Sequence, residues 1–229
     1  MKRDNRAVGL GVLGLAVCGA ALMSAHALAV DVRGSVKGGD SKPKAVETVR
    51  GPYWHEWNGF IEPKKSSADL SREVAVVLIG DEAMKDAVTV TMQDGTLSPS
   101  TVVMQKGSAL RVRNDDDFTH QLFAEGLSQF DAVETSAGQA RQLQVDQEGS
   151  FPILDRLAPY VKGHLHVLPK ISKLANPQSD GTFKFEDVAP GNYTLKVFRG
   201  GAEVSSTTLE VADKREFVID PISVEVNGK

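Results

Sequence analysis

Residues 180–197 read Asp-Gly-Thr-Phe-Lys-Phe-Glu-Asp-Val-Ala-Pro-Gly-Asn-Tyr-Thr-Leu-Lys-Val, and apolar and polar side chains alternate on both sides of the central Pro-Gly pair. Alternation with a period of two is typical of a β-strand that buries one face. Pro followed by Gly is typical of a tight turn. The stretch therefore predicts two strands joined by a turn, with six side chains facing one core: Phe183, Phe185, Val188, Tyr193, Leu195 and Val197.

Strand patterns of this kind continue along most of the chain. Residues 30–36 alternate, and the short segments 87–92, 100–104 and 109–112 are separated by Gly, Pro and Asp residues. Residues 74–79 form an unbroken apolar run, which indicates a strand that is buried on both faces. Outside the N-terminal segment, no stretch keeps a helical period for three turns. The sequence therefore predicts an all-β protein built as sandwiches.

The first stretch also carries a family motif. Residues 180–197 contain every fixed position of the pattern D-G-x-F-x-F-x-x-V-x-P-G-x-Y-x-L-x-V. This pattern resembles the carboxypeptidase regulatory-like module, a transthyretin-like β-sandwich. The family normally opens with strands like residues 32–36 and 74–79. The module is an accessory one, so the resemblance implies no peptidase activity.

A second set of motifs lies between residues 96 and 167. In order, the chain contains Leu97-Ser98-Pro99, then a segment from Val103 to Gly107, then Asn114-Asp115-Asp116-Asp117-Phe118-Thr119-His120, and finally residues 155–167, which read Asp-Arg-Leu-Ala-Pro-Tyr-Val-Lys-Gly-His-Leu-His-Val. Their order and spacing resemble exported cupredoxins of the plastocyanin and methylamine-utilisation type, which are small blue-copper β-sandwiches. Gly163, Leu165 and Val167 stand where the family has its Gly and two inward apolar residues.

The copper ligands of that family are mostly replaced. The family's Cys, His and Met positions hold Asp155, Ala158 and Val161, and His120 alone matches a ligand. A blue-copper site needs a thiolate and two imidazoles, whereas the single cysteine, Cys18, lies in the N-terminal segment. The resemblance therefore implies a cupredoxin fold that lacks the copper-ligand loop and has no cofactor.

Together the resemblances imply a cupredoxin-like Greek-key sandwich that is packed with, or inserted into, a second Ig- or transthyretin-like sandwich. We expect residues 30–86 to supply the first strands of the regulatory-like sandwich and a long aromatic loop. Residues 87–169 are expected to form the cupredoxin-like domain, and residues 170–229 the remainder of the regulatory-like sandwich.

The N-terminus has the pattern of a secretory signal. Residues 1–29 combine a basic start, an apolar stretch and an Ala-x-Ala cleavage site. A retained membrane anchor and a lipoprotein signal around Cys18 are the alternatives. Removal of this signal peptide changes the net charge from −4 to about −6, which disfavours nucleic acid and anionic lipid as partners. We expect a periplasmic or secreted protein with no stable membrane insertion after the signal is removed.

Two further histidines lie near the ligand positions. His164 and His166 are two residues apart in a predicted strand, so both point away from Leu165 and Val167. They form either a polar outer face, an interface with the second sandwich or, with His120, a metal site. Because the chain lacks the Gly-x-Ser-x-Gly and His-Glu-x-x-His templates and has no mature cysteine, we expect no enzymatic activity.

A partner-binding segment is predicted between residues 53 and 60. It holds both tryptophans of the chain among four aromatic residues, namely Tyr53, Trp54, Trp57 and Phe60. Such side chains dominate protein interfaces and also stack on sugar rings. The alternative is a lid that folds back over a sandwich end. The sequence thus favours an exported, non-catalytic binding or structural subunit that contacts an envelope protein or polysaccharide. A periplasmic copper-binding or copper-transfer protein that uses only histidines is the alternative.

Overall fold

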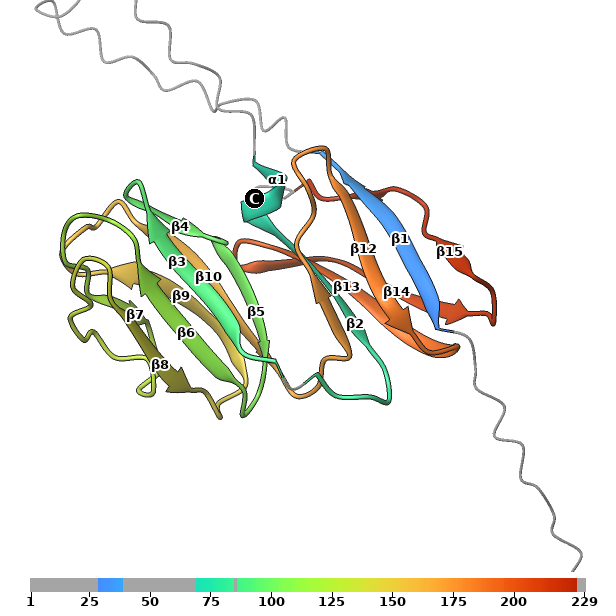
Figure 1. The fold of residues 1–229 in the computed structure, drawn as a ribbon, viewed down its shortest axis with the longest axis horizontal. Coiled ribbons are helices and arrows are strands. Elements are labelled where there is room, and N and C mark those ends of the chain that lie inside the picture. The colour runs from blue at the N-terminus through green and yellow to red at the C-terminus, as the bar shows by residue number, and fades with distance from the viewer. Residues whose placement is uncertain (1–28, 39–68, 85, 226–229) are drawn as a thin grey trace, which may run out of the picture.

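The computed structural model describes residues 29–38, 69–84 and 86–225, which form sixteen β-strands and one four-residue helix, α1 (Leu70–Glu73). Figure 1 shows two β-units side by side, which we call the first and second unit. The all-β prediction is confirmed, and the predicted strand bounds agree with the observed ones to within two residues. Within the described ranges, no helix is long and apolar enough to cross a membrane.

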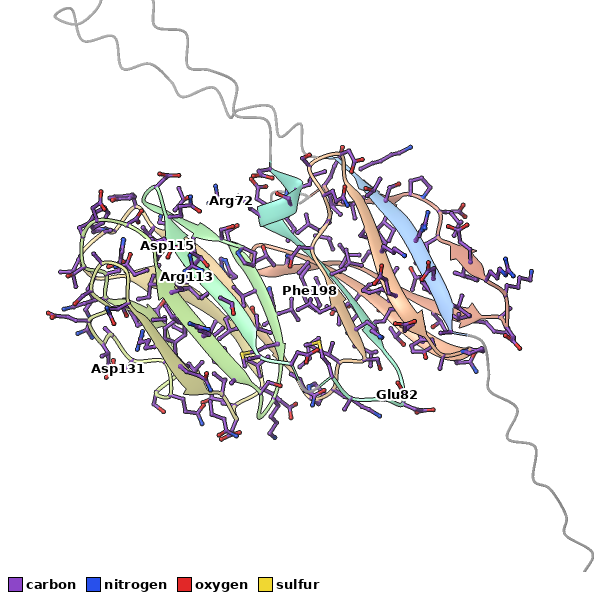
Figure 2. The ribbon with its side chains drawn as sticks, in the orientation of Figure 1. Arg72, Glu82, Arg113, Asp115, Asp131 and Phe198 are labelled. Atoms are coloured by element: carbon purple, nitrogen blue, oxygen red, sulfur yellow. The ribbon has the colours of Figure 1, made fainter. Side chains whose placement is uncertain are left out.

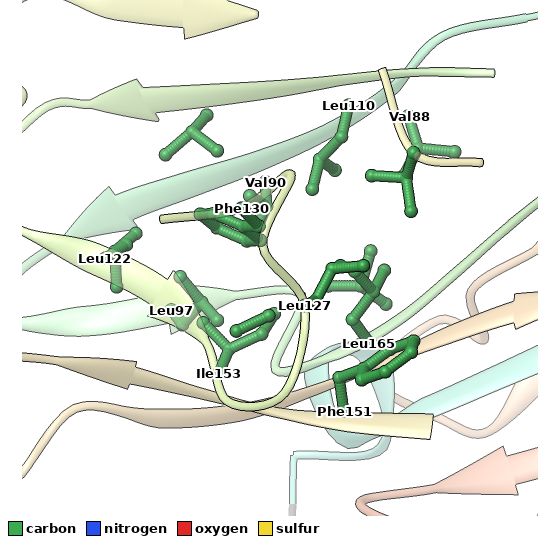
Figure 3. Packing of buried hydrophobic residues seen from close by; sticks show 14 of the residues in the cluster. Val88, Val90, Leu97, Leu110, Leu122, Leu127, Phe130, Phe151, Ile153 and Leu165 are labelled. Atoms are coloured by element: carbon green, nitrogen blue, oxygen red, sulfur yellow. The ribbon is translucent and has the colours of Figure 1, made fainter. Parts of the chain in front are cut away.

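The first unit consists of two four-stranded sheets. One has the order β4 (Thr96–Ser98), β3 (Val88–Gln93), β6 (Ala109–Asn114), β8 (Ala140–Gln144). The other has the order β5 (Thr101–Gln105), β10 (Lys162–Leu168), β9 (Gly149–Asp155), β7 (Leu122–Ala124). The sheets enclose one hydrophobic core, in which Phe130, Ile153 and Leu165 are fully buried (Figure 3).

The second unit also consists of two sheets around its own core. In one sheet β1 (Val30–Lys37) pairs with three strands, β12 (Thr182–Val188), β15 (Glu216–Val218) and β16 (Ile222–Ser223). The other has the order β11 (Lys173–Ala175), β2 (Val74–Ile79), β13 (Gly191–Arg199), β14 (Ala202–Val211). The chain thus enters the second unit with β1 and β2, builds the first unit from β3 to β10, and returns.

The stretch 180–197 folds as predicted into two strands that share a core. All six of its inward side chains are buried in the core of the second unit. However, β12 pairs with β1, and β13 pairs with β2 and β14. The turn at Pro190 therefore carries the chain from one sheet to the other. That this unit belongs to the regulatory-like family stays a prediction.

Strand β2 is buried on both faces, which confirms the interpretation of its unbroken apolar run. Val76 and Leu78 point into the core of the second unit. Ala75 and Val77 point the other way and form a third cluster with Val103 of β5, Ile171 and Phe198 of β13. This cluster joins the two units, and alternate side chains of one strand therefore serve two separate cores.

Candidate functional site

Three loops of the first unit meet at one end of its sandwich: the turn between β3 and β4, the segment after β6 and the loop after β9. Because β3 and β6 are parallel neighbours, the residues that follow them lie at the same edge of their sheet. In the facing sheet, Leu122 at the start of β7 pairs with Asp155 at the end of β9. The predicted ligand positions at His120 and Asp155 are therefore brought together, as the cupredoxin register requires.

The His120 side chain is enclosed by two carboxylates. Its Nδ1 lies 2.5 Å from Oδ2 of Asp155, and its Nε2 lies 2.9 Å from Oδ2 of Asp116. The imidazole ring of His120 is 0% exposed. Asp116 and Asp155 are also buried. We call these three residues the Asp-His-Asp cluster (Asp116, His120 and Asp155).

Backbone groups fix the carboxylate of Asp155. Its Oδ1 accepts hydrogen bonds from the peptide N–H groups of Gln121, Leu157 and Ala158, at N–O distances of 3.2, 2.8 and 3.2 Å. Several N–H donors directed at one oxygen stabilise a buried carboxylate. Asp155 thus links the loop after β9 to Gln121, the residue just before β7.

Asp116 is held in a comparable way from the other side. The peptide N–H of Gly95, in the turn between β3 and β4, donates to both of its carboxylate oxygens. Its own peptide N–H donates to the side chain of Asn114, whose amide group donates to the carbonyls of Phe118 and Thr135, both at 2.8 Å. An Asn that binds the backbone two residues later is a common turn device. The cluster therefore fixes all three loops.

A hydrogen count shows that the imidazole has no free lone pair. Each ring nitrogen of His120 faces a carboxylate oxygen. Two such bonds need either an imidazole that carries both ring protons or one protonated carboxyl group that donates to the ring. In both cases both ring nitrogens are engaged, so neither nitrogen is available to coordinate a metal ion.

The other positions at which the sequence resemblance places copper ligands do not fit copper either. Ala158 and Val161 are each 2% exposed and belong to the hydrophobic core. A blue-copper site requires a thiolate and a second imidazole in the places that Asp155 and Ala158 occupy. Across the part of the chain that the structure describes, no group of three or more His, Cys, Asp or Glu is arranged to hold a metal ion.

Comparison with known families agrees with this architecture. The family model of the cupredoxin-like domain matches residues 67–167. The chain therefore contains a cupredoxin-like domain. The sequence interpretation began this domain at residue 87, whereas the matched segment begins earlier and includes α1 and β2. Strand β2, however, pairs with strands of the second unit.

Solved structures with a related fold include several copper proteins. A Cu-containing nitrite reductase from Thermus scotoductus is 19% identical, with a TM-score of 0.34, and the match covers 39% of this chain and 24% of that one. Amicyanin from Paracoccus versutus is 16% identical, with a TM-score of 0.33, over 41% of this chain and 97% of its own. A purple cupredoxin from Nitrosopumilus maritimus is 16% identical, with a TM-score of 0.33, over 35% of this chain and 99% of its own. No curated protein sequence matches the chain.

His164 and His166 lie on the outer face of β10, at the boundary with the second unit. Leu165 and Val167 fill the core, as the alternation predicts. His166 Nε2 lies 2.7 Å from the carbonyl oxygen of Gly200, and burial lowers the pKa of both histidines. The structure does not bring these two side chains and His120 into a common site.

Loops of the first unit carry exposed apolar side chains that the sequence interpretation missed. Four large apolar side chains on its loops are 46 to 68% exposed, and we call them the apolar patch: Phe118, Val133, Leu157 and Tyr160. Figure 2 labels Arg113 and Asp115 of the same unit, which form a bidentate ion pair. The sequence signal that could have indicated such a surface is the presence of apolar residues next to the predicted ligand positions.

The Asp-His-Asp cluster contacts the side chain of Phe118, the backbone of Leu157 and the glycine against which Tyr160 packs. The Phe118 ring lies 4.5 Å from the imidazole ring of the cluster. The peptide N–H of Leu157 donates to Asp155. Tyr160 packs against Gly95, where a Cβ atom would lie 3.3 Å from its ring. The cluster therefore supports the part of the patch formed by Phe118, Leu157 and Tyr160. The partner-binding residues predicted from the sequence, Tyr53, Trp54, Trp57 and Phe60, lie outside the described residues.

Proposed function

We propose that this protein is an exported, non-catalytic binding subunit of the cell envelope, periplasmic or secreted. Its cupredoxin-like domain presents the apolar patch to a protein partner. The observation that supports the proposal is the Asp-His-Asp cluster. Two of its members, His120 and Asp155, stand where the sequence resemblance places copper ligands, and it lies beside the loops that expose Phe118, Leu157 and Tyr160.

The cluster itself is unsuited to catalysis. A general acid or base must come within hydrogen-bond reach of its substrate. The imidazole of His120 is 0% exposed, and both of its nitrogens are bonded to carboxylates. The cluster is therefore a structural element that shapes the surface above it. The second unit, which resembles a regulatory-like sandwich, is proposed to act as an accessory module.

A protein partner fits the patch better than a polysaccharide. Two of the four side chains, Val133 and Leu157, are aliphatic and 55% and 54% exposed. Aliphatic side chains offer no flat face to a sugar ring, whereas they bury well against apolar protein surface. Exposed apolar groups gathered on a few loops mark interaction sites more often than chance.

The patch predicts a specific loss of binding. Leu157→Ser combined with Tyr160→Ser should leave the melting temperature within about 2 °C of the parent, because both side chains are largely exposed. Partner affinity should fall about tenfold or more, since truncated interface anchors cost at least 1–2 kcal/mol. A photo-crosslinker at Tyr160 in cells identifies the partner, and titration calorimetry with that purified partner measures the loss.

The controls separate this proposal from its rivals. A crosslinker at Val218, which is 71% exposed in the second unit, should give no adduct. The variant Trp54→Ala with Trp57→Ala tests the segment predicted from the sequence. Equal adducts at Tyr160 and Val218, or unchanged affinity of the Leu157/Tyr160 variant, would refute the patch as the docking site. Retention on purified envelope polysaccharide that the same variant abolishes would assign the surface to sugar.

A further inference from the structure

The boundary between the two units combines a small apolar cluster with a network of polar contacts. The tip between β13 and β14 reaches across to the first unit, where the peptide N–H of Gly200 donates to the Thr101 hydroxyl of β5 at 2.8 Å. That hydroxyl donates to the carbonyl of Glu73 at 2.5 Å. Arg199 binds the carboxylate of Glu73 at 2.7 Å. The tip is therefore fixed in place by several polar contacts.

His166 is the titratable group at the centre of this contact. It is 4% exposed, its Nε2–H donates to the Gly200 carbonyl at 2.7 Å, and its ring lies 4.6 Å from the ring of Phe198, with an angle of 37° between the planes. At Gly201 a Cβ atom would lie only 2.8 Å from Nε2 of His164. The absence of a side chain at Gly201 thus lets the tip approach His164 closely, and Gly200 has a left-handed backbone with a φ of 56°.

The charges around His166 come from three strands. His164 lies on the same face of β10 and opposes a positive charge on its neighbour. The Gly200 carbonyl and, to a lesser extent, Glu203 of β14 favour that charge, but Lys196 of β13 binds Glu203 at 2.9 Å. The charge of Arg199 is compensated by Glu73. Burial outweighs the favourable contributions, so the pKa of His166 is lowered from its ordinary value of 6.5.

We propose that the contact between His166 and the Gly200 tip is a proton-sensitive latch between the two units. The neutral ring donates to Gly200 and packs on Phe198. A protonated ring keeps its bond to the Gly200 carbonyl, but its charge is buried against Phe198 and beside a second histidine, and burial is the larger effect. Protonation therefore favours a state in which the tip has moved away from β10.

The direction of the effect follows from linkage. When the units separate at this contact, His166 regains its ordinary pKa and binds protons more readily than in the closed contact. The contact is therefore strongest above the ordinary pKa of about 6.5 and weakens as pH falls below it. For each pH unit by which closure lowers the pKa of His166, the closed state becomes about tenfold less favoured at acidic pH.

The test is an NMR titration of the unaltered protein between pH 7.5 and pH 5.0. The His166 ring should titrate below pH 6.5, and the amide signals of Gly200 and Gly201 should move with the same midpoint. Amide exchange at Val77 and Val103, corrected for the intrinsic effect of pH, should be about threefold faster or more at pH 5.0, as tip release predicts.

The matched variant is His166→Gln, which keeps an N–H donor for Gly200 and carries no charge. It should abolish the pH dependence of exchange while leaving the exchange at pH 7.5 close to that of the parent. A parent protein with pH-independent exchange at this boundary, or a His166 midpoint at or above 6.5, overturns the latch. If His166→Gln folds and keeps the full response, the latch is overturned as well.

Discussion

Replacement of Phe185 by Ala is expected to lower the free energy of unfolding by about 3 to 5 kcal/mol, and replacement of Tyr193 by Ala by a similar amount. Phe185 is 2% exposed, and its ring packs edge-on against Phe183. The Tyr193 ring fills the space over Gly80, where a Cβ atom would lie 2.5 Å from it. Either truncation leaves a cavity between two sheets that cannot collapse fully. Denaturant unfolding measures both losses.

A matched control separates packing from hydrogen bonding. Tyr193→Phe removes only the bond from the Tyr193 hydroxyl to the Ala189 carbonyl, which is 2.9 Å long, and should cost about 1 kcal/mol. If both alanine variants unfold within about 0.5 kcal/mol of the parent, the second unit does not have the core described above.

The second large effect concerns Asp155. Asp155→Ala should destabilise the protein by about 3 to 5 kcal/mol, because removal of one member of a buried, hydrogen-bonded charged group leaves its partners without compensation. Four groups lose their hydrogen-bond partner: the His120 ring and the peptide N–H groups of Gln121, Leu157 and Ala158. Chemical denaturation of the purified protein gives the value.

Two substitutions calibrate this result. Asp155→Asn keeps an acceptor oxygen for the peptide N–H groups and should cost clearly less than Asp155→Ala. Asp117→Ala, at an exposed carboxylate one residue after the cluster member Asp116, should change stability by about 0.5 kcal/mol or less. A loss below about 1 kcal/mol for Asp155→Ala would show that the cluster does not support these loops.

Much of the fold was predictable because side-chain alternation reports directly on which face of a strand is buried. The pattern around Gly163, Leu165 and Val167 is an example. The two apolar residues lie in the core, and a Cβ at Gly163 would approach the Ser100 carbonyl to 2.8 Å. Alternation does not specify which strands pair. The sequence therefore predicted the two strands of residues 180–197 but not that they belong to opposite sheets.

The candidate site was only partly predictable, since its contacts join residues that are distant in sequence. The register put His120 and Asp155 at neighbouring ligand positions, but their hydrogen bond spans 35 residues. Asp116 lies between two similar residues, and only the fold shows that it alone is buried while Asp115 and Asp117 are exposed. The exposure of Phe118 and Tyr160 also depends on tertiary structure, because no periodic pattern exists in a loop.

The central interpretation is that this domain keeps the cupredoxin fold while Asp155, Ala158 and Val161 replace the copper ligands. A suitable positive control is the triple variant Asp155→Cys, Ala158→His, Val161→Met, which returns the ligand types of the family to the end of the domain where His120 lies. For this variant we expect copper binding and a thiolate absorption band.

The most direct test is the copper content of the unaltered protein after it has been loaded with Cu(II) and treated with a mild chelator. Both nitrogens of His120 are bonded to carboxylates, and two other ligand positions are apolar and buried. We therefore predict far less than one copper ion per chain and no blue absorption band. Retention of one copper ion per chain would contradict the interpretation.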